Sequence, residues 1–180
     1  MLKQLKRTIY FQGRVIDLVV DEVEYPTGTK ATMEVVQHPG GAVAVPLFDD
    51  GNVMLIDQFR YALGKRILEL PAGKLDRNED PLECARRELE EETGWKGEGW
   101  TKLGSIHTSV GFCNEVLHLF LATGLSRVAG GHRRTEGESD IEVRILSLRE
   151  AIGLVERGEI SDAKTVCGLF MTEKKLRSGM

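Results

Sequence analysis

The sequence predicts a mixed α+β fold that begins with an antiparallel β-hairpin extension. The first third of the chain consists of short runs with β-type patterning, separated by turn residues. One clearly bounded helix follows, and two helical segments close the chain after further strands. With 180 residues, 41% of them hydrophobic, the chain is long enough for one domain with a full core, or for a domain with a small appendage.

The N-terminal third is predicted to form two hairpins. Residues 14–25 and 30–38 flank the turn sequence Pro-Thr-Gly-Thr, which favours a long first hairpin. Residues 41–61 carry Asp50-Gly51 between two apolar runs, so we expect a second hairpin there.

A short apolar strand over 66–73 leads to a helix whose two ends are marked in the sequence. Asp80 suits the N-cap position, and Pro81 suits the first helical position. Gly94 suits the left-handed residue that ends many helices. The helix is therefore predicted over 81–93.

The remainder of the chain is predicted as strands followed by two helices. The strand-like segments cover 100–108, 116–125 and 141–148, a polar loop covers 126–140, and the helices cover 148–158 and 162–179.

The helix over 81–93 concentrates negative charge, with four glutamates in the five positions from 88 to 92. Like charges at this spacing repel one another on a helix. At about 100° per residue, Glu88, Glu91 and Glu92 share a flank beside the stripe that packs into the core, whereas Glu90 points elsewhere. The three carboxylates on that flank are therefore expected to converge.

Two interpretations of this acidic flank stay open on the residues alone. A solvated acidic helix is one, because glutamate is a good helix former. The other is a site for a hard divalent cation with oxygen ligands, which would offset the repulsion. Mg²⁺ is favoured because it takes few protein carboxylates and leaves positions for water or phosphate oxygens.

Composition argues against several classes of function. A net charge of -4 does not favour broad nucleic-acid binding, and no apolar run is long enough to cross a membrane. The first residues lack the apolar core of a secretory signal. Three widely spaced cysteines, Cys84, Cys113 and Cys167, form no CxxC motif, so we expect a reduced, cytoplasmic protein.

The stretch from 73 to 95 resembles the signature of Nudix hydrolases. That signature is a Gly, five residues, a Glu, seven residues and then Arg-Glu-apolar-x-Glu-Glu-x-Gly-apolar. By chance it would arise on the order of once in 10⁸ windows if each fixed residue occurred at about 7%. The matching positions are Gly73, Glu79, Arg87, Glu88, Leu89, Glu91, Glu92, Gly94 and Trp95.

The resemblance implies an α/β/α sandwich, with a mixed β-sheet between helices and an N-terminal antiparallel β-hairpin extension. Residues 1–39 would be a stranded region for dimerisation and substrate binding, and residues 40–180 the catalytic domain. In the resembling branch such N-terminal strands build a domain-swapped dimer, which implies a homodimer here.

The resemblance also implies a set of metal ligands. Two or three Mg²⁺ ions, for which Mn²⁺ is expected to substitute, would be held by Glu88, Glu91, Glu92 and the carbonyl oxygen of Ala72. Arg87 can reach Glu91 at i,i+4 and hold its carboxylate in place. The resemblance counts both among the catalytic residues, with a structural role as the alternative for Arg87 and for Glu79.

Motifs on either side of the signature indicate which branch of the Nudix hydrolases the sequence resembles. "QFRYALGKRILELPAGKLD" before the signature, "GFCNE" after it and "DAKT" near the C-terminus resemble ADP-ribose pyrophosphatases. The implied reaction is Mg²⁺-dependent hydrolysis of ADP-ribose to AMP and ribose 5-phosphate. Val110 stands where that branch usually has proline, which leaves the choice among nucleoside diphosphate sugars open.

Further residues are candidates for contact with this substrate. Arg60 is expected to clamp a phosphate, Glu69 to contact a ribose hydroxyl or a water, and Phe112 to stack on a base. Glu115, in the "GFCNE" loop, is the candidate general base. Ordinary surface roles remain the alternative for Arg60 and Glu115.

Three other functions stay open. The first is a Nudix hydrolase with another substrate: GDP-mannose, a dinucleoside polyphosphate or an oxidised nucleoside triphosphate. The second is a non-catalytic ligand sensor with the same fold. The third is an isomerase of isoprenoid diphosphates. The complete signature and the lack of a basic DNA-binding segment argue against the sensor.

Overall fold

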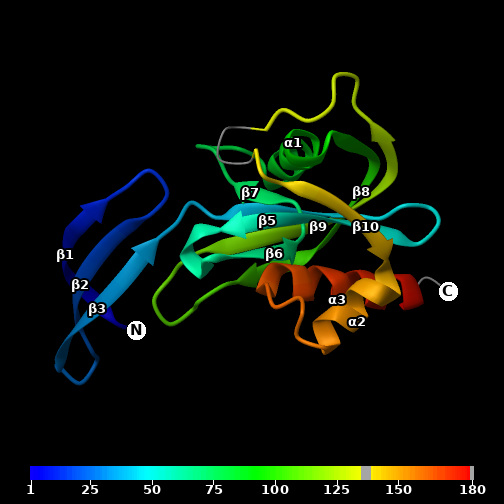
Figure 1. Ribbon diagram of the computed structural model, residues 1–180. Helices are drawn as coiled ribbons and strands as arrows, with labels where there is room; N and C mark the ends of the chain where they lie inside the picture. The colour runs from blue at the N-terminus through cyan, green and yellow to red at the C-terminus, as the bar shows by residue number, and fades with distance from the viewer. Residues whose placement is uncertain (135–138, 179–180) are drawn as a thin grey trace. The chain divides into compact units, whose positions relative to one another are not determined.

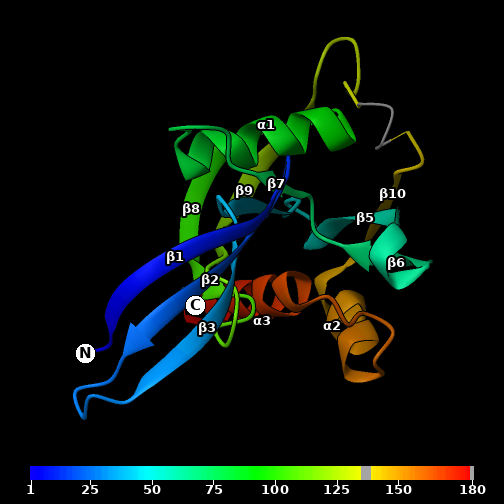
Figure 2. The same ribbon diagram turned by 90° about the vertical axis from the view of Figure 1, so that its left-hand side faces the viewer.

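The computed structural model describes residues 1–134 and 139–178, which divide into two compact units (Figures 1 and 2). The first unit combines Met1–Gly40 with His107–Val116. The second combines Gly41–Ile106 with Leu117–Met180.

The first unit is built on a three-stranded antiparallel sheet in the order β1 (Lys3–Gln12), β2 (Asp17–Glu24), β3 (Lys30–Gln37). β2 and β3 are the hairpin predicted over 14–38. β1 was not predicted, because almost every residue of this edge strand is exposed and its sequence shows no buried face. Arg7 on β1 donates two hydrogen bonds of 2.7 Å to Asp21 on β2.

The segment 107–116 joins this unit through hydrogen bonds to β3. The Val36 N–H donates to the Phe112 carbonyl at 2.7 Å, and the Asn114 N–H donates to the Val36 carbonyl at 3.2 Å. The Asn114 side chain accepts from the His38 N–H at 2.7 Å. These bonds explain why a loop between two strands of the second unit groups with the N-terminal sheet.

The second unit contains two sheets in the described part of the chain. Their orders are β7-β4-β9-β8 and β10-β5-β6, with β4 parallel to β9 and antiparallel to β7. The strands are β4 (Gly41–Pro46), β5 (Asn52–Arg60), β6 (Lys65–Glu69), β7 (Ala72–Lys74), β8 (Trp95–His107), β9 (Val116–Arg127) and β10 (Glu142–Ser147). A 3₁₀ turn, η1 (Tyr61–Leu63), joins β5 to β6.

The hairpin predicted over 41–61 is wrong. β4 pairs with β7 and β9, whereas β5 pairs with β6 and β10, and a single bridge joins Leu47 to Val53. The turn at Asp50-Gly51 does form, with Gly51 at a φ of 83°. β4 is buried along its whole length and β5 through its middle, and each strand has partners on both of its edges. The turn therefore carries the chain from one sheet to the other.

Helices cover both sides of these sheets (Figure 1). α1 (Pro81–Thr93) packs on β4 and β7, while α2 (Leu148–Glu156) and α3 (Ala163–Ser178) lie on the other side, where α3 contacts β4 and α2 contacts β5 and β10. The predicted α+β sandwich is thus confirmed. Its core joins strand and helix residues that are at most 8% exposed, including Val43, Val45, Leu55, Leu119, Leu148 and Leu169.

The predicted helix ends agree closely with the structure. α1 begins and ends where expected, with Asp80 accepting from the Leu82 N–H at 2.8 Å and Gly94 at a φ of 72°. The polar loop predicted from residue 126 begins after β9, which ends at Arg127. Residues 135–138 of that loop, and the last position of the helix predicted to 179, lie outside the described residues. No helix in the described ranges is long and apolar enough to span a membrane.

Candidate active site

Two glutamates of the acidic flank of α1 are buried next to β7. Glu88 is 7% exposed and Glu92 is 3% exposed, while Glu91 lies closer to solvent. The Ala72 N–H donates to the Glu92 carboxylate at 3.1 Å. Of the three glutamates predicted to converge, Glu88 and Glu92 therefore lie where β7 meets α1, whereas Glu91 is bonded to Arg87 nearer to solvent.

Gly73 is needed at this junction because the Glu88 carboxylate lies directly on its backbone. A Cβ atom at position 73 would lie 1.9 Å from Glu88 Oε1, far inside van der Waals contact. The requirement is one of space, since Gly73 is not among the residues with positive φ. The first glycine of the signature is thus explained by the position of its second glutamate.

Arg87 joins three acidic residues of the signature through one guanidinium. It donates to Glu79 from Nε at 2.9 Å and from Nη2 at 3.1 Å. Its Nη1 donates to Glu88 at 2.7 Å and to Glu91 at 3.1 Å, the latter being the i,i+4 contact expected from the sequence. We call Glu79, Glu88, Glu91 and Glu92 the carboxylate cluster.

These hydrogen bonds shift the pKa values of Glu79 and Arg87. The Arg87 guanidinium lowers the pKa of Glu79 to about 2, against the opposing effect of burial, and the Asp76 N–H adds to the same effect. Hydrogen bonding to Glu79 in turn raises the pKa of Arg87. Glu79 therefore stays ionised at all ordinary pH values and holds Arg87 against the loop that precedes α1.

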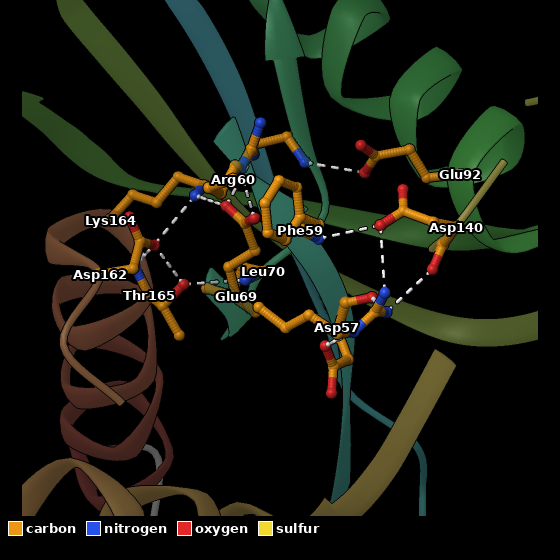
Figure 3. A network of polar contacts seen from close by, with 12 residues as sticks. Asp57, Phe59, Arg60, Glu69, Leu70, Glu92, Asp140, Asp162, Lys164 and Thr165 are labelled. Carbon is orange, nitrogen blue, oxygen red and sulfur yellow. Dashed lines mark hydrogen bonds and ion pairs between the residues drawn. The ribbon is translucent and has the colours of Figure 1, made fainter. Parts of the chain in front are cut away.

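A second polar network lies at the end of β6 (Figure 3). Arg60 donates from Nε to Glu69 Oε1 at 2.6 Å and from Nη2 to Glu69 Oε2 at 2.8 Å. Lys164 Nζ also donates to Glu69 Oε2, and it donates to Asp162 at 2.9 Å. We call Arg60, Glu69, Lys164 and Asp162 the charge chain.

The members of the charge chain differ in exposure. Glu69, expected to contact a ribose hydroxyl or a water, has a side chain only 1% exposed, and both of its oxygens accept bonds from side chains. Arg60, expected to clamp a phosphate, keeps a side chain that is 40% exposed. Burial alone would lower the pKa of Arg60, but the nearby Glu69, Glu92 and Asp162 raise it. Arg60, the exposed end of the charge chain, is therefore always positively charged.

The "DAKT" segment, residues 162–165, forms the buried end of this network. Thr165 donates from Oγ1 to Asp162 at 2.6 Å and accepts from the Leu70 N–H at 2.8 Å. Burial opposes ionisation of Asp162, but Lys164 and Thr165 lower its pKa overall. The segment thus fixes the backbone just before Pro71.

Lys164 was not among the predicted site residues, although the sequence contains a signal for it. A lysine in the first turn of a helix opposes the helix dipole, so it is favoured there only when an acid pairs with it. Sequence spacing does not reveal that Glu69, 95 positions earlier, is that acid.

Glu115 and Phe112 belong to the first unit, whereas the other predicted site residues belong to the second. Glu115 accepts from Thr108 Oγ1 at 2.8 Å, and its other oxygen lies 3.2 Å from His38 Nδ1. Phe112 is 58% exposed and is anchored through its carbonyl to Val36.

The carboxylate cluster offers oxygen donors of the kind that a hard divalent cation prefers. Within residues 1–134 and 139–178, no group of three or more His, Cys, Asp or Glu side chains is arranged closely enough to hold a metal ion. The residues fit such an ion by their chemistry. A cleft of about 390 Å³ gives solvent access to this helix and is lined by Glu83, Arg86, Arg87, Glu90, Glu91 and Arg133.

Comparison with known proteins shows which chains this one is similar to. The family model of the NUDIX domain matches residues 38–169. The ADP-ribose pyrophosphatase of Bacillus subtilis is 42% identical over 96% of this chain and 93% of its own length. A methanol dehydrogenase activator of Bacillus methanolicus is 40% identical over 91% of this chain and 88% of its own length.

A solved structure shares the fold. It is described as an ADP compounds hydrolase, and it aligns with a TM-score of 0.86 over 99% of this chain and 95% of that chain, at 18% sequence identity.

Replacing Gly73 by alanine should weaken binding of a divalent cation without unfolding the protein. The new methyl group must displace the Glu88 carboxylate, while the backbone at position 73 accepts alanine. We expect about a 10–100-fold loss of Mn²⁺ affinity, measured from free Mn²⁺ by electron paramagnetic resonance. Gly104→Ala is the control, because a Cβ there meets only ordinary contacts with Met171. Unchanged Mn²⁺ affinity in Gly73→Ala would contradict the role of this junction.

Replacing Glu79 by glutamine should lower stability in a pH-dependent way. The folded-state pKa is about 2, below the ordinary value of 4.5, so the ionised group stabilises the fold fully above pH 4.5. That contribution is lost as pH falls toward 2. Thermal unfolding should show Glu79→Gln to be less stable at pH 7 by on the order of 1 kcal/mol, and the difference should shrink below pH 4.5. Glu83→Gln, on the exposed face of α1, is the control; a constant difference at every pH would refute the coupling.

Proposed function

This chain belongs to the Nudix family, and we propose that it is a pyrophosphatase that hydrolyses ADP-ribose to AMP and ribose 5-phosphate. The observation that carries the proposal is the Arg87-bound carboxylate cluster in a chain that is 42% identical, over nearly its whole length, to an ADP-ribose pyrophosphatase. Nucleoside diphosphate sugars are accordingly the substrate class.

Divalent metal ions are the expected cofactor, as Nudix hydrolases generally use them. Glu88, Glu91, Glu92 and the Ala72 carbonyl would hold two or three Mg²⁺ ions, for which Mn²⁺ would substitute. When bound, the ions supply positive charge that neutralises the phosphoryl oxygens in the transition state. Arg87 sets the orientation of Glu88 and Glu91, and Gly73 leaves the space that the Glu88 carboxylate fills.

The remaining chemistry falls to side chains that position substrate and move a proton. Arg60 binds a phosphate oxygen of the diphosphate through its exposed guanidinium. Glu115 takes a proton from the attacking water, and the bond from Thr108 keeps one oxygen of its carboxylate in place. Phe112, exposed in the same loop, offers a face for stacking on the base.

A homodimer is the proposed assembly, formed through the first unit. The edge strand β1 and the turn that follows it carry large apolar side chains that are between 38% and 56% exposed: Leu5, Ile9, Phe11, Val15 and Ile16. Exposed apolar residues concentrated on one edge strand favour an interaction site. A second copy of this chain is the partner that the resemblance favours. We further propose a cytoplasmic location, which the three free cysteines support.

The proposed reaction is tested with a substrate panel. With Mg²⁺, ADP-ribose should be turned over faster than GDP-mannose, a dinucleoside polyphosphate or an oxidised nucleoside triphosphate, with AMP and ribose 5-phosphate seen by phosphorus NMR. Glu92→Gln should lower kcat by on the order of 100-fold and leave the fold intact, because the amide oxygen can still accept from Ala72.

Glu90→Gln, on the same helix turn, serves as the matched control and should keep its activity. Full turnover by Glu92→Gln would contradict the assignment of Glu92 as a metal ligand. A preference for another member of the panel would replace ADP-ribose as the substrate.

The dimer is tested by size-exclusion chromatography with light scattering. We expect a particle of two 20.0 kDa chains, and we expect Ile9→Lys with Phe11→Lys to shift it toward the monomer, because both changes put charge on the apolar surface. Val110→Lys, at an exposed position outside this surface, is the control. A wild-type monomer with full activity would rule the dimer out.

A further inference from the structure

Lys164 is a buried cation for which the proposed chemistry has no use. Its side chain is 10% exposed, and it donates to Glu69 and Asp162. A buried ammonium group is costly unless its partners are well placed, so this arrangement has a strict geometry. Figure 3 shows the hydrogen bonds of Arg60 and Lys164 meeting at the Glu69 carboxylate.

Arg60 presents one edge of its guanidinium away from this network. Its bonds to Glu69 use Nε and Nη2. Within residues 1–134 and 139–178, Nη1 makes no hydrogen bond, while the side chain as a whole is 40% exposed. Nη1 is therefore the donor available to a ligand, and its direction depends on the plane of the Glu69 carboxylate.

Lys164 also constrains that plane. A carboxylate that accepts only from Arg60 can turn together with it as a unit. Lys164, which shares Oε2 with Arg60 Nη2, removes this freedom because it is itself held by Asp162. Asp162 is in turn fixed by Thr165, whose hydroxyl also anchors the Leu70 N–H. Each link in the charge chain is thus anchored by the next.

We propose that Lys164 is a positioning residue for the substrate diphosphate, acting through Glu69 to aim Arg60 Nη1 at a phosphate oxygen. The inference rests on the proposed function, since it assigns the origin of the phosphate clamp within that site. It gives the "DAKT" segment a role in binding affinity, besides attaching α3 to the end of β6.

The experiment is a double-mutant cycle between Lys164→Met and Arg60→Gln. Binding of ADP-ribose is measured calorimetrically in EDTA, where no turnover occurs, and KM and kcat are measured with Mg²⁺. Lys164→Met should raise Kd and KM about 10-fold and change kcat little, because a phosphate contact held in both ground and transition states affects binding uniformly. In the Arg60→Gln background the same change should have less than about a 2-fold effect.

Lys175→Met, at an exposed position later in α3, is the matched control and should leave both constants unchanged. If Lys164→Met does not fold, Glu69→Gln with Lys164→Met removes the buried carboxylate charge together with its partner. That double variant should fold and show the same rise in KM, because Arg60 has lost its orienting carboxylate.

The outcomes separate the two proposals. The wild type could turn over ADP-ribose while the effects of Lys164→Met and Arg60→Gln on Kd and KM multiply independently. That result overturns the positioning role of Lys164 and leaves the proposed function standing. A lowered melting temperature with unchanged Kd and KM does the same, since it marks a purely structural lysine. A wild type that neither binds nor hydrolyses ADP-ribose overturns both.

Discussion

The bond between the Arg87 guanidinium and its glutamates is the interaction on which the site depends. Four carboxylates near one helix face would repel one another, most strongly where burial lowers the dielectric constant. Arg87 binds three of them at 2.7–3.1 Å and lies one residue before the most constrained, Glu88. The acidic helix can therefore fold with its carboxylates already gathered, before any cation is present.

This arrangement also accounts for the fixed glycine that opens the signature. β7 passes so close to α1 that the Glu88 carboxylate rests on the Gly73 backbone, and the neighbouring Ala72 N–H reaches Glu92. One short strand thus contacts both buried glutamates of the helix. The spacing between Gly73 and Glu88 in the sequence reflects a loop of fixed length that returns the chain to this contact.

The charge chain connects a different part of the molecule to the segment just before β7. Arg60, Glu69, Lys164 and Asp162 alternate in sign, so each buried charge has an oppositely charged neighbour. The charge chain runs from Asp162, just before α3, to the exposed guanidinium of Arg60. Thr165 connects it to the backbone of Leu70, two residues before Ala72. The carboxylate cluster and Arg60, the proposed phosphate ligand, are therefore both connected to the short segment that runs from the end of β6 into β7.

The sequence by itself determined the limits of α1, the gathering of Glu88, Glu91 and Glu92 on one flank, and the family, because helix ends, helical spacing and the signature are all local patterns. Tertiary structure decided the rest. β4 and β5 separated into different sheets because buried strands take partners that are distant in sequence. Glu69 became a buried link and Lys164 its partner because a lysine 95 positions away packs against it. Pairings at such separations leave no periodic trace in a single chain, whereas contacts within one helix do.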